Sequence, residues 1–289
     1  METTITFKIE SDTLTLDIAI ADINSLHLHE MTIPEATQQL ASRIKKDGYV
    51  RDPVIADRDS FVVLDGMHRV TAAKTLGCIR IPVCLVNYDD PSICIDTWYR
   101  AFQGESTIQF PTIVNRAGYK VSPTNIERAE DEVEKKKAAG FLADHTLCAL
   151  IERNSSPNIH ESYQAISLIE KEAKGEGMRI RYETAGDARA GLHSKRLDAI
   201  VGPRKISKAD VKTYGTRNDP FPHKATRHLI PARPLMVNVP LESLQDSSLN
   251  LEDLNQKLVN DLRRRTLTRI SPGSVIHDRR YDEEVFVFQ

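Results

Sequence analysis

The sequence is short of several features that would place it in a functional class at once. It has only four cysteines among 289 residues and no CxxC pair, which argues against the usual zinc and dithiol redox motifs. No apolar run approaches the roughly 18 residues that a membrane-spanning helix needs. The formal net charge is only -2, so no strongly basic or acidic field indicates a nucleic-acid partner or a polyanion mimic.

What is present is typical of a globular protein. Hydrophobic residues make up 40% of the chain and charged residues 28%, and the length suffices for one large domain or two of ordinary size. Three of the cysteines lie in apolar runs, where they are expected to be small core residues. The first four residues lack the charged-then-apolar pattern of a signal peptide. We therefore expect a soluble protein of a reducing cytoplasm.

In the first third of the chain, strands and helices are expected to alternate. Alternating apolar and polar residues predict strands over residues 4–9 and 13–20. Pro34 is expected to open a helix that ends at Gly48. Further predicted elements are two strands around a turn at 57–60, a helix over 70–76 and a buried strand over 81–88.

The next segment predicts a helix and then a loop. Asp89, Asp90 and Pro91 favour a turn and the N-cap of a helix that carries Trp98 and Arg100. Residues 106–124 are expected to form a loop with one strand. Beyond them the pattern predicts helices over 125–139, 159–173 and 207–215, and strands over 145–151, 178–183, 196–202 and 283–289. This alternation predicts a second α/β unit.

The stretch VVLDGMHRVTAAKTLG (residues 62–77) combines an acid, a glycine and two basic side chains at one strand-to-helix turn. Gly66 lets the backbone approach a ligand, and the helix start that follows suits a phosphate. His68 and Arg69 supply donors, and Asp65 fits if a Mg²⁺ ion lies between it and the phosphate. The alternative is a structural turn in which Asp65 caps the helix and the two basic side chains are solvated. The residues alone leave both interpretations open.

Several other side chains are candidates beside an ordinary structural role. Glu30 lies between a strand and a helix, where it could serve as a general base or remain a solvated loop acid. His27 and His29 share one strand face, and packing is favoured over metal binding. The sole tryptophan, Trp98, is expected to pack in a core.

A late, proline-bounded segment carries a cluster of polar side chains. Lys224, Thr226, Arg227 and His228 lie between Pro222 and Pro231, and together they could grip an anion or form a solvated basic loop. The basic run at residues 263–265 is expected to be a solvated helix end rather than a nucleic-acid contact.

Around residues 65–69 the sequence resembles the ParB/sulfiredoxin-like superfamily, and within it the free L-serine kinases. The likeness rests on Asp65-Gly66-Met67-His68-Arg69, on Glu30, on Trp98-Tyr99-Arg100 and on the FPHKATRHLIP segment at 221–231. It covers about residues 15–245. It implies a ParB/sulfiredoxin-like nucleotide-binding domain over 1–105, a second α/β domain over 106–245 with the active site in the cleft between them, and a C-terminal extension over 246–289 with no assigned role.

The resemblance also implies a mechanism of phosphoryl transfer from ADP or ATP to free L-serine. The phosphates would lie on Gly66, Met67, His68 and Arg69, and Asp65 would organise Mg²⁺. Glu30, Asp65 and His68 would form the catalytic set, with Glu30 taking the proton of the serine hydroxyl. Trp98, Lys224, Thr226, Arg227 and His228 would hold the serine and its developing phosphate. The product, O-phosphoserine, would supply the synthesis of cysteine or of another serine-derived compound.

Two departures separate this chain from other branches of the superfamily. Met67 stands where sulfiredoxins carry the reactive cysteine, which argues against sulfinic-acid reduction. No convincing helix-turn-helix follows residue 104, as a DNA-reading ParB protein would need. The alternative to a kinase is a nucleotide-responsive regulator or DNA-associated protein. The sequence leaves open the donor nucleotide, the choice between serine and a close analogue, and the oligomeric state.

Overall fold

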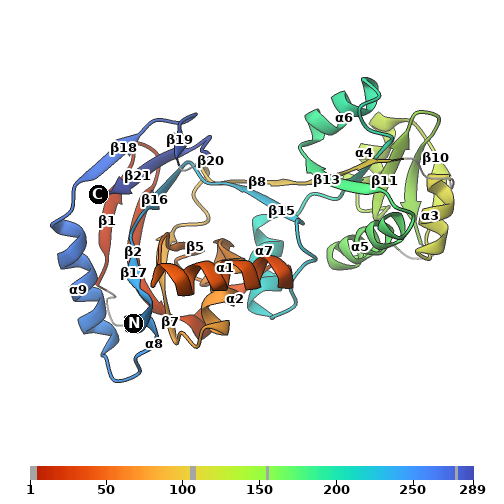
Figure 1. Ribbon diagram of the computed structural model, residues 1–289. Coiled ribbons are helices and arrows are strands. Elements are labelled where there is room, and N and C mark those ends of the chain that lie inside the picture. The colour runs from red at the N-terminus through yellow and green to blue at the C-terminus, as the bar shows by residue number, and fades with distance from the viewer. Residues whose placement is uncertain (1–4, 105–108, 154–155, 277–278) are drawn as a thin grey trace. The chain divides into compact units, whose positions relative to one another are not determined.

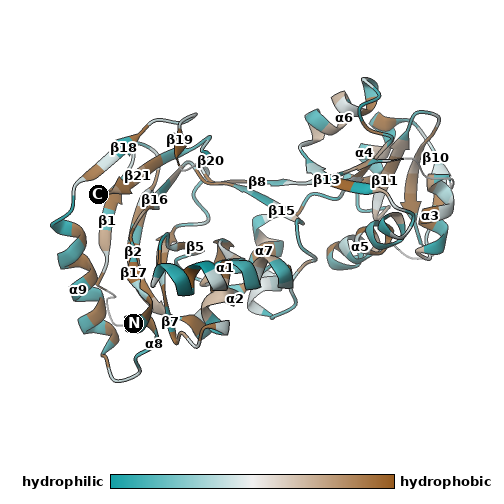
Figure 2. Cartoon of the chain, in the orientation of Figure 1, coloured by the Kyte–Doolittle hydropathy of each residue, from teal (hydrophilic) through white to brown (hydrophobic). Residues whose placement is uncertain are grey.

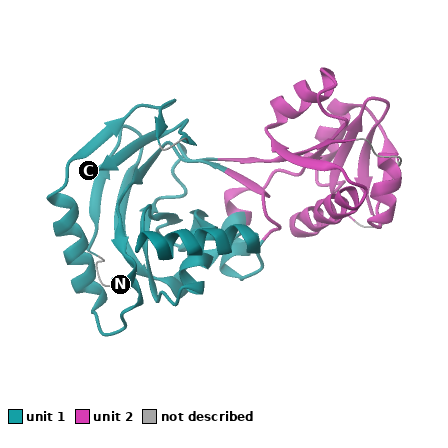
Figure 3. Ribbon diagram, in the orientation of Figure 1, with its two compact units in different colours: residues 1–94, 211–220, 228–289 teal, residues 95–210, 221–227 magenta. Residues whose placement is uncertain are grey.

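The computed structural model describes residues 5–104, 109–153, 156–276 and 279–289 (Figure 1). The chain forms two compact units (Figure 3): unit 1 contains residues 1–94, 211–220 and 228–289, and unit 2 contains residues 95–210 and 221–227. Residues 246–289, which the sequence sets apart as an extension, thus belong to unit 1. The functional ranges 1–105 and 106–245 remain a prediction.

Unit 1 is built on a mixed six-stranded sheet in the order β1-β2-β7-β5-β6-β3. The β5–β7 and β3–β6 pairs are parallel and the other pairs are antiparallel. Strands β2, β5 and β7 are almost continuously buried, as their β-branched and aliphatic residues predict. The strands are β1 (Phe7–Glu10), β2 (Thr15–Asp22), β3 (His27–Leu28), β5 (Val54–Asp57), β6 (Val62–Asp65) and β7 (Arg80–Val86).

The two helices predicted for residues 34–48 and 70–76 are present, the second starting three residues earlier than predicted. Helix α1 (Pro34–Asp47) has a proline in its first turn and stops at Gly48, whose φ of 77° is the left-handed conformation of a helix C-terminus. Helix α2 (Met67–Thr75) follows Gly66, and α1 and α2 pack against each other. A short 3-10 turn, η1 (Ile23–Ser25), links β2 to β3.

The C-terminal part of the chain packs onto the same sheet. Helix α9 (Leu251–Arg263) is amphipathic, with alternating hydrophilic and hydrophobic stretches in Figure 2. The side chain of its buried residue Asn255 accepts from the backbone N–H of Ile20 (2.7 Å) and donates to the carbonyl of Ile20 (3.0 Å). These two bonds fasten α9 to β2.

Short strands complete unit 1. They form a three-stranded sheet in the order β16-β21-β18 and the pairs β17–β4 and β19–β20. The remaining elements with residues in this unit are β4 (Tyr49–Val50), α7 (Lys208–Thr216), β15 (Thr226–Leu229), β16 (Ala232–Leu235), β17 (Val239–Pro240), α8 (Leu241–Gln245), β18 (Leu267–Ile270), β19 (Val275–Ile276), β20 (Arg279–Arg280) and β21 (Glu284–Phe288).

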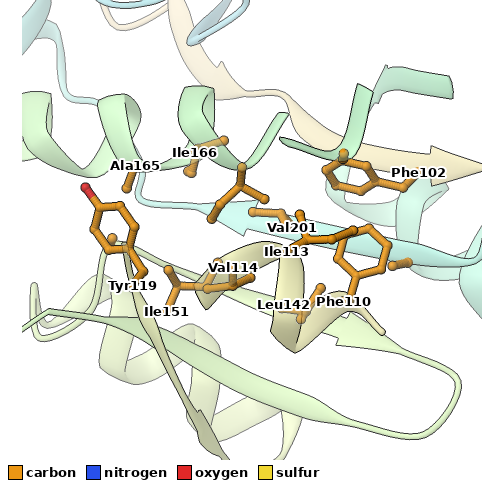
Figure 4. Close-up of a cluster of buried hydrophobic side chains, with 14 of the residues drawn as sticks. Phe102, Phe110, Ile113, Val114, Tyr119, Leu142, Ile151, Ala165, Ile166 and Val201 are labelled. Atoms are coloured by element: carbon orange, nitrogen blue, oxygen red, sulfur yellow. The ribbon is translucent and has the colours of Figure 1, made fainter. Parts of the chain in front are cut away.

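Unit 2 is a sheet with helices on both faces. Its six strands run in the order β10-β12-β11-β14-β9-β13, and every pairing is antiparallel. Neighbouring residues on a strand pack on opposite faces of the sheet: Leu142 lies in one core cluster and Phe141 in the other. The first cluster lies against α3 and α5 (Figure 4), and the second lies against α4 and α6.

The elements of unit 2 are β8 (Cys94–Thr97), β9 (Tyr99–Gln103), α3 (Phe110–Arg116), β10 (Lys120–Pro123), α4 (Ile126–Glu134), β11 (Gly140–Asp144), β12 (Cys148–Glu152), α5 (Ile159–Gly175), β13 (Arg179–Glu183), α6 (Ala185–His193) and β14 (Ala199–Pro203). Asn158 caps α5 in a reciprocal pair of bonds with Glu161, which fixes the helix start that the sequence predicts. The mixed α/β class predicted for both parts of the chain is confirmed.

The predicted helix through Trp98 and Arg100 is wrong, because the chain forms β8 and β9 there. Asp90 does not cap a helix. Its side chain accepts from the backbone N–H and the hydroxyl of Ser92 (2.8 and 2.6 Å) and closes a turn. Strand β9 lies between β14 and β13, so pairing with distant residues decides its conformation.

Other differences follow from the same cause. The segment expected to be a loop with one strand contains α3 as well as β10, and β11 and α6 were not expected. Between residues 216 and 245, where the sequence predicts no helix or strand, the chain forms β15, β16, β17 and α8. Thr4 of the first predicted strand and residues 105–108 lie outside the described residues. None of the helices within the described ranges has the length and apolar character to cross a membrane.

Candidate active site

The turn at residues 65–69 has the backbone geometry that the sequence predicts. Gly66 has a φ of 102°, and a Cβ atom there would lie 2.8 Å from Cγ1 of Val54 and 2.9 Å from Nε of Arg69. Only glycine fits this position. Met67 is the first residue of α2, so the N-terminus of that helix opens directly at the turn. Its unpaired N–H groups carry partial positive charge that suits a phosphate.

Asp65 lies between two arginines. Its Oδ2 accepts from Arg69 (2.7 Å) and from Arg233 (3.1 Å), a residue that the sequence analysis did not single out. Burial acts to raise the pKa of this carboxyl. The charges of Arg69, Arg233 and Arg279 together outweigh that effect and lower the pKa to about 2. Asp65 is therefore ionised throughout the physiological range.

Arg69 has contacts inside unit 1 besides Asp65. Its Nη1 donates to the carbonyls of Asp52 (2.9 Å) and Pro53 (2.5 Å), which anchors the segment before β5. The guanidinium therefore holds the turn together in addition to the role that the resemblance implies for it. Its contact with a phosphate remains a prediction.

The low pKa of Asp65 predicts a pH-dependent part of the stability. The folded-state pKa of about 2 lies below the ordinary value of 3.8, so this stabilisation is complete above about pH 4 and is lost as the pH falls towards 2. Its size is about 1–2 kcal/mol, because solvent screens a side chain that is 35% exposed. We expect about half of the stability difference between wild type and Asp65→Asn to disappear between pH 5 and pH 3. Urea unfolding at both pH values measures it, and a constant difference would contradict it.

The donor set fits a magnesium ion held mainly by phosphate. Both arginines contact Oδ2 of Asp65, and no contact of Oδ1 is found among the described residues. Within those residues there is also no group of three or more His, Cys, Asp or Glu side chains that could hold a metal. Mg²⁺ is commonly bound by one or two carboxylates together with substrate phosphates and water. Asp65 can supply one such carboxylate oxygen.

Glu30 is almost fully buried beside His29. It is 6% exposed, and its Oε1 lies 3.9 Å from Nε2 of His29. Nδ1 of the fully buried His29 lies 2.6 Å from the carbonyl of Val63, so Nδ1 carries the proton and donates it. Burial lowers the pKa of His29, against the opposing charge of Glu30. His29 therefore acts as a packed, neutral neighbour of Glu30, as the sequence favoured.

His228 joins the same cluster, although it lies about 200 residues further along the chain. Its ring packs edge-on against the ring of His29 at 5.1 Å between centroids. Its Nε2 lies 2.7 Å from the hydroxyl of Tyr88. The fold thus brings the predicted base Glu30 and the predicted substrate-binding His228 into one part of unit 1. Tyr88 was missed because nothing in its local sequence distinguishes it from a core tyrosine.

His68 connects this cluster to the turn at 65–69. Its Nε2 accepts from the backbone N–H of Ile33 (3.1 Å) at the start of α1. Ile33 has no side-chain cap of its own, so His68 satisfies one of the unpaired groups of that helix terminus. Glu30 lies three residues earlier in the same loop, which places Glu30, His68 and Asp65 along one edge of the unit 1 sheet.

The predicted serine-binding residues of unit 2 gather around Trp98. Nζ of Lys224 lies 5.5 Å and Cζ of Arg227 lies 5.3 Å from the centroid of its ring. Arg227 also pairs with Asp96 (3.7 Å), and Thr226 is buried. Trp98 is half-buried and belongs to neither of the two core clusters described for unit 2, so its predicted core role is wrong. It provides an aromatic surface for two cations.

Arg100, close to Trp98 on β9, is fully buried in a charged network. Its Nε donates to Oε1 of Glu170 (2.7 Å) and its Nη1 to the carbonyl of Trp98 (2.7 Å). Tyr182 donates to the other oxygen of Glu170 (3.0 Å), and the Tyr182 ring lies 5.5 Å from Cζ of Arg100. The pair therefore positions β9 and, through the carbonyl of Trp98, the residue that precedes this strand.

Glu170→Gln should destabilise the protein, because it leaves the Arg100 charge buried without its counterion. We expect the free energy of unfolding to fall by about 3 kcal/mol. Urea unfolding measures the change. Glu172→Gln, two residues along α5 and partly exposed, is the control and should change stability by less than about 0.5 kcal/mol. Equal effects of the two substitutions would show that the buried Arg100–Glu170 pair contributes no more to the free energy of unfolding than a partly exposed glutamate does.

Unit 1 also contains a pocket of about 320 Å³, within the size range of small-molecule sites. Its lining combines apolar side chains with several arginines, a composition that suits a nucleotide. The sequence indicates only Arg69 among its residues, because the others come from three distant segments without a local motif. The lining includes Ile44, Val50, Ile55, Leu235, Tyr49 and Tyr281, together with Arg43, Arg51, Arg69, Arg233, Arg279, Asp47 and Asp52.

Comparison with known proteins supports the family likeness. No family model matches the chain. An ATP-dependent L-serine kinase from Staphylothermus marinus is 26% identical over 235 residues, covering 78% of this chain and 90% of that protein. An ADP-dependent L-serine kinase from Thermococcus kodakarensis is 24% identical over 246 residues, covering 82% and 97%. The resemblance to the free L-serine kinases is confirmed.

A solved structure shows that the fold is shared. A free serine kinase in complex with AMP superposes with a TM-score of 0.70 at 20% identity, covering 79% of this chain and 94% of that chain. The similarity therefore extends over most of both molecules rather than over the turn alone. The predicted fold is confirmed.

Proposed function

We propose that this chain transfers a phosphoryl group from ADP or ATP to the hydroxyl group of free L-serine and forms O-phospho-L-serine. One observation carries the proposal. Unit 1 places the buried carboxylate of Glu30 beside His29, whose ring packs on His228, and His68 joins the loop after Glu30 to the turn at Asp65 and Gly66. A base, an imidazole and a phosphate turn are the groups that such a transfer needs.

The nucleotide lies in the arginine-rich pocket of unit 1. Its base and sugar contact the apolar side chains of the pocket, and its phosphates point to the N-terminus of α2 at Met67 and His68. Asp65 would hold Mg²⁺, which neutralises phosphate charge when bound. Arg69 and Arg233 keep Asp65 ionised and oriented for that role.

Glu30 acts as the general base. It takes the proton of the serine hydroxyl as the serine oxygen forms a bond to the terminal phosphorus of the nucleotide. The bond between that phosphorus and the bridging oxygen breaks, and the nucleotide leaves with one phosphate fewer. Burial of Glu30 limits access of water, which would otherwise compete as the acceptor.

Trp98, Lys224, Thr226 and Arg227 bind the serine, and His228 binds its developing phosphate. A free amino acid carries a carboxylate, and the two cations on Trp98 can pair with it. The reaction takes place in a reducing cytoplasm, in keeping with four unpaired cysteines, and its product supplies cysteine synthesis or another serine-derived product.

The direct test is to incubate the purified protein with Mg²⁺, L-serine and either ADP or ATP, and to detect O-phosphoserine by mass spectrometry. Product with one nucleotide establishes the activity and identifies the donor. L-threonine and L-homoserine in parallel reactions test the choice of acceptor. No product with any acceptor, together with nucleotide-dependent binding to DNA at low salt, would favour a regulator instead.

A further inference from the structure

The C-terminal strands supply part of the pocket that we assign to the nucleotide. Arg279 and Tyr281 line it, although both lie in the part of the chain beyond residue 245 that the family resemblance does not cover. We propose that Arg279 is a nucleotide-binding residue of this chain, that it binds a phosphate group of the nucleotide, and that Tyr281 positions it. This inference rests on the proposed function, since it deepens the assignment of the nucleotide pocket.

The first support is the position of Tyr281. It is 7% exposed, its N–H donates to the carbonyl of Ser274 (2.9 Å), and its carbonyl accepts from the N–H of Gly273 (2.7 Å). The neighbouring strand β21 pairs with β16 in register, with Val285 opposite Arg233. Tyr281 is thus a fixed wall of the pocket rather than a residue of a loose tail.

The second support is the state of the Arg279 side chain. Its Cζ lies over the ring of Tyr281 at 4.7 Å from the centroid, and the residue is exposed. Among the described residues, no acid forms an ion pair with Arg279. The adjacent Arg280 differs, because it pairs with Asp282 (3.3 Å). Arg279 is therefore a cation held on an aromatic surface at a pocket, with its donors available to an anion.

The third support is proximity to the phosphate turn. Arg279 lines the same pocket as Arg69 and Arg233, which lie at the carboxylate that ends β6. Both of those arginines already donate hydrogen bonds to that carboxylate. Arg279 is the arginine of this group best able to contact a nucleotide phosphate instead.

The same strands also hold Arg233. Its Nε pairs with Glu283, two residues after Tyr281, while its Nη1 pairs with Asp65. Burial acts to lower the pKa of Arg233, and the charges of Asp65 and Glu283 raise it, so this arginine stays charged. The C-terminal segment therefore contributes one arginine directly and orients another.

The test compares Arg279→Ala with Arg280→Ala, a neighbouring arginine that does not line the pocket. Isothermal titration calorimetry of each full-length protein with AMP and with adenosine separates phosphate contacts from base contacts. We expect Arg279→Ala to weaken AMP binding about tenfold and to leave adenosine binding unchanged, because one charge-assisted contact to phosphate is lost. Arg280→Ala should match wild type for both ligands.

A second variant tests the role of Tyr281 as a positioning residue. Tyr281→Leu keeps an apolar wall but removes the ring under Arg279, and we expect AMP affinity to fall about threefold with adenosine affinity unchanged. In the double variant with Arg279→Ala this loss should disappear, because the ring acts through the arginine. A purely structural tyrosine would lower adenosine affinity to the same degree.

Three outcomes would overturn the inference. Equal AMP affinity of Arg279→Ala and Arg280→Ala removes Arg279 from the site. Equal losses for AMP and adenosine remove the phosphate assignment. A wild-type protein that binds neither AMP nor ADP removes the nucleotide pocket altogether. Failure of the proposed kinase is distinguishable, because in that case AMP binds and depends on Arg279 while serine is not phosphorylated.

Discussion

Glu30→Gln lowers kcat for serine phosphorylation about a thousandfold and leaves the affinity for AMP unchanged. Glutamine has the same size and fills the same buried position, so the packing against His29 remains. It cannot accept the proton of the serine hydroxyl, and loss of a general base typically costs between about a hundredfold and ten-thousandfold in rate. Steady-state kinetics together with calorimetry with AMP measure both quantities.

The matched control is Glu35→Gln, an exposed glutamate in the first turn of α1. It should leave kcat and nucleotide affinity within a factor of two of wild type. His29 cannot readily replace the lost base, because burial lowers the pKa of its imidazole and disfavours the protonated form. An unchanged kcat in Glu30→Gln would exclude Glu30 as the base. Loss of AMP binding in that variant would instead indicate that Glu30 holds the nucleotide site in shape.

Asp65→Asn lowers the Mg²⁺-dependent kcat at least about a hundredfold and raises the affinity for AMP measured in EDTA a few-fold. The two effects have opposite signs for one physical reason. The substitution removes a negative charge from beside the phosphate, which favours the metal-free anion. It also replaces the carboxylate oxygen that would hold the metal against the phosphates with a neutral amide oxygen, which is a weaker ligand for Mg²⁺.

Titration of activity against Mg²⁺ concentration provides the decisive measurement. The concentration for half-maximal rate should rise in Asp65→Asn and stay constant in Asp59→Asn, an exposed aspartate in the turn between β5 and β6. If Asp65 served only to hold Arg69 and Arg233, AMP binding in EDTA would fall because both arginines would lose their orientation. A fall in AMP affinity in EDTA, together with an unchanged Mg²⁺ concentration for half-maximal rate, would therefore exclude Asp65 as a metal ligand.

The local sequence is sufficient to predict the turn within residues 62–77 and the strand and helix on either side of it. The apolar run of β6, the glycine with positive φ and the start of α2 each follow from neighbouring residues, as do the first and last turns of α1. The sequence also carried the family likeness, because its motifs are short and contiguous. Glu30, Asp65 and His228 follow from that likeness without any knowledge of the fold.

The tertiary structure decided what depends on residues far apart in the chain. The residues of β9 predict a helix, but the chain forms a strand there. The partners that make it a strand, β13 and β14, lie about 80–100 residues later, so the local sequence carries no signal for it. The surroundings of Asp65 include Arg233 and Arg279 from remote segments, so neither its ion pair with Arg233 nor its low pKa has a local signal. The pocket of unit 1 likewise exists only once β16 and the C-terminal strands pack beside α1 and β5. Periodicity and turn chemistry act over a few residues and thus determine the elements, whereas burial and charge pairing act through space and determine the site.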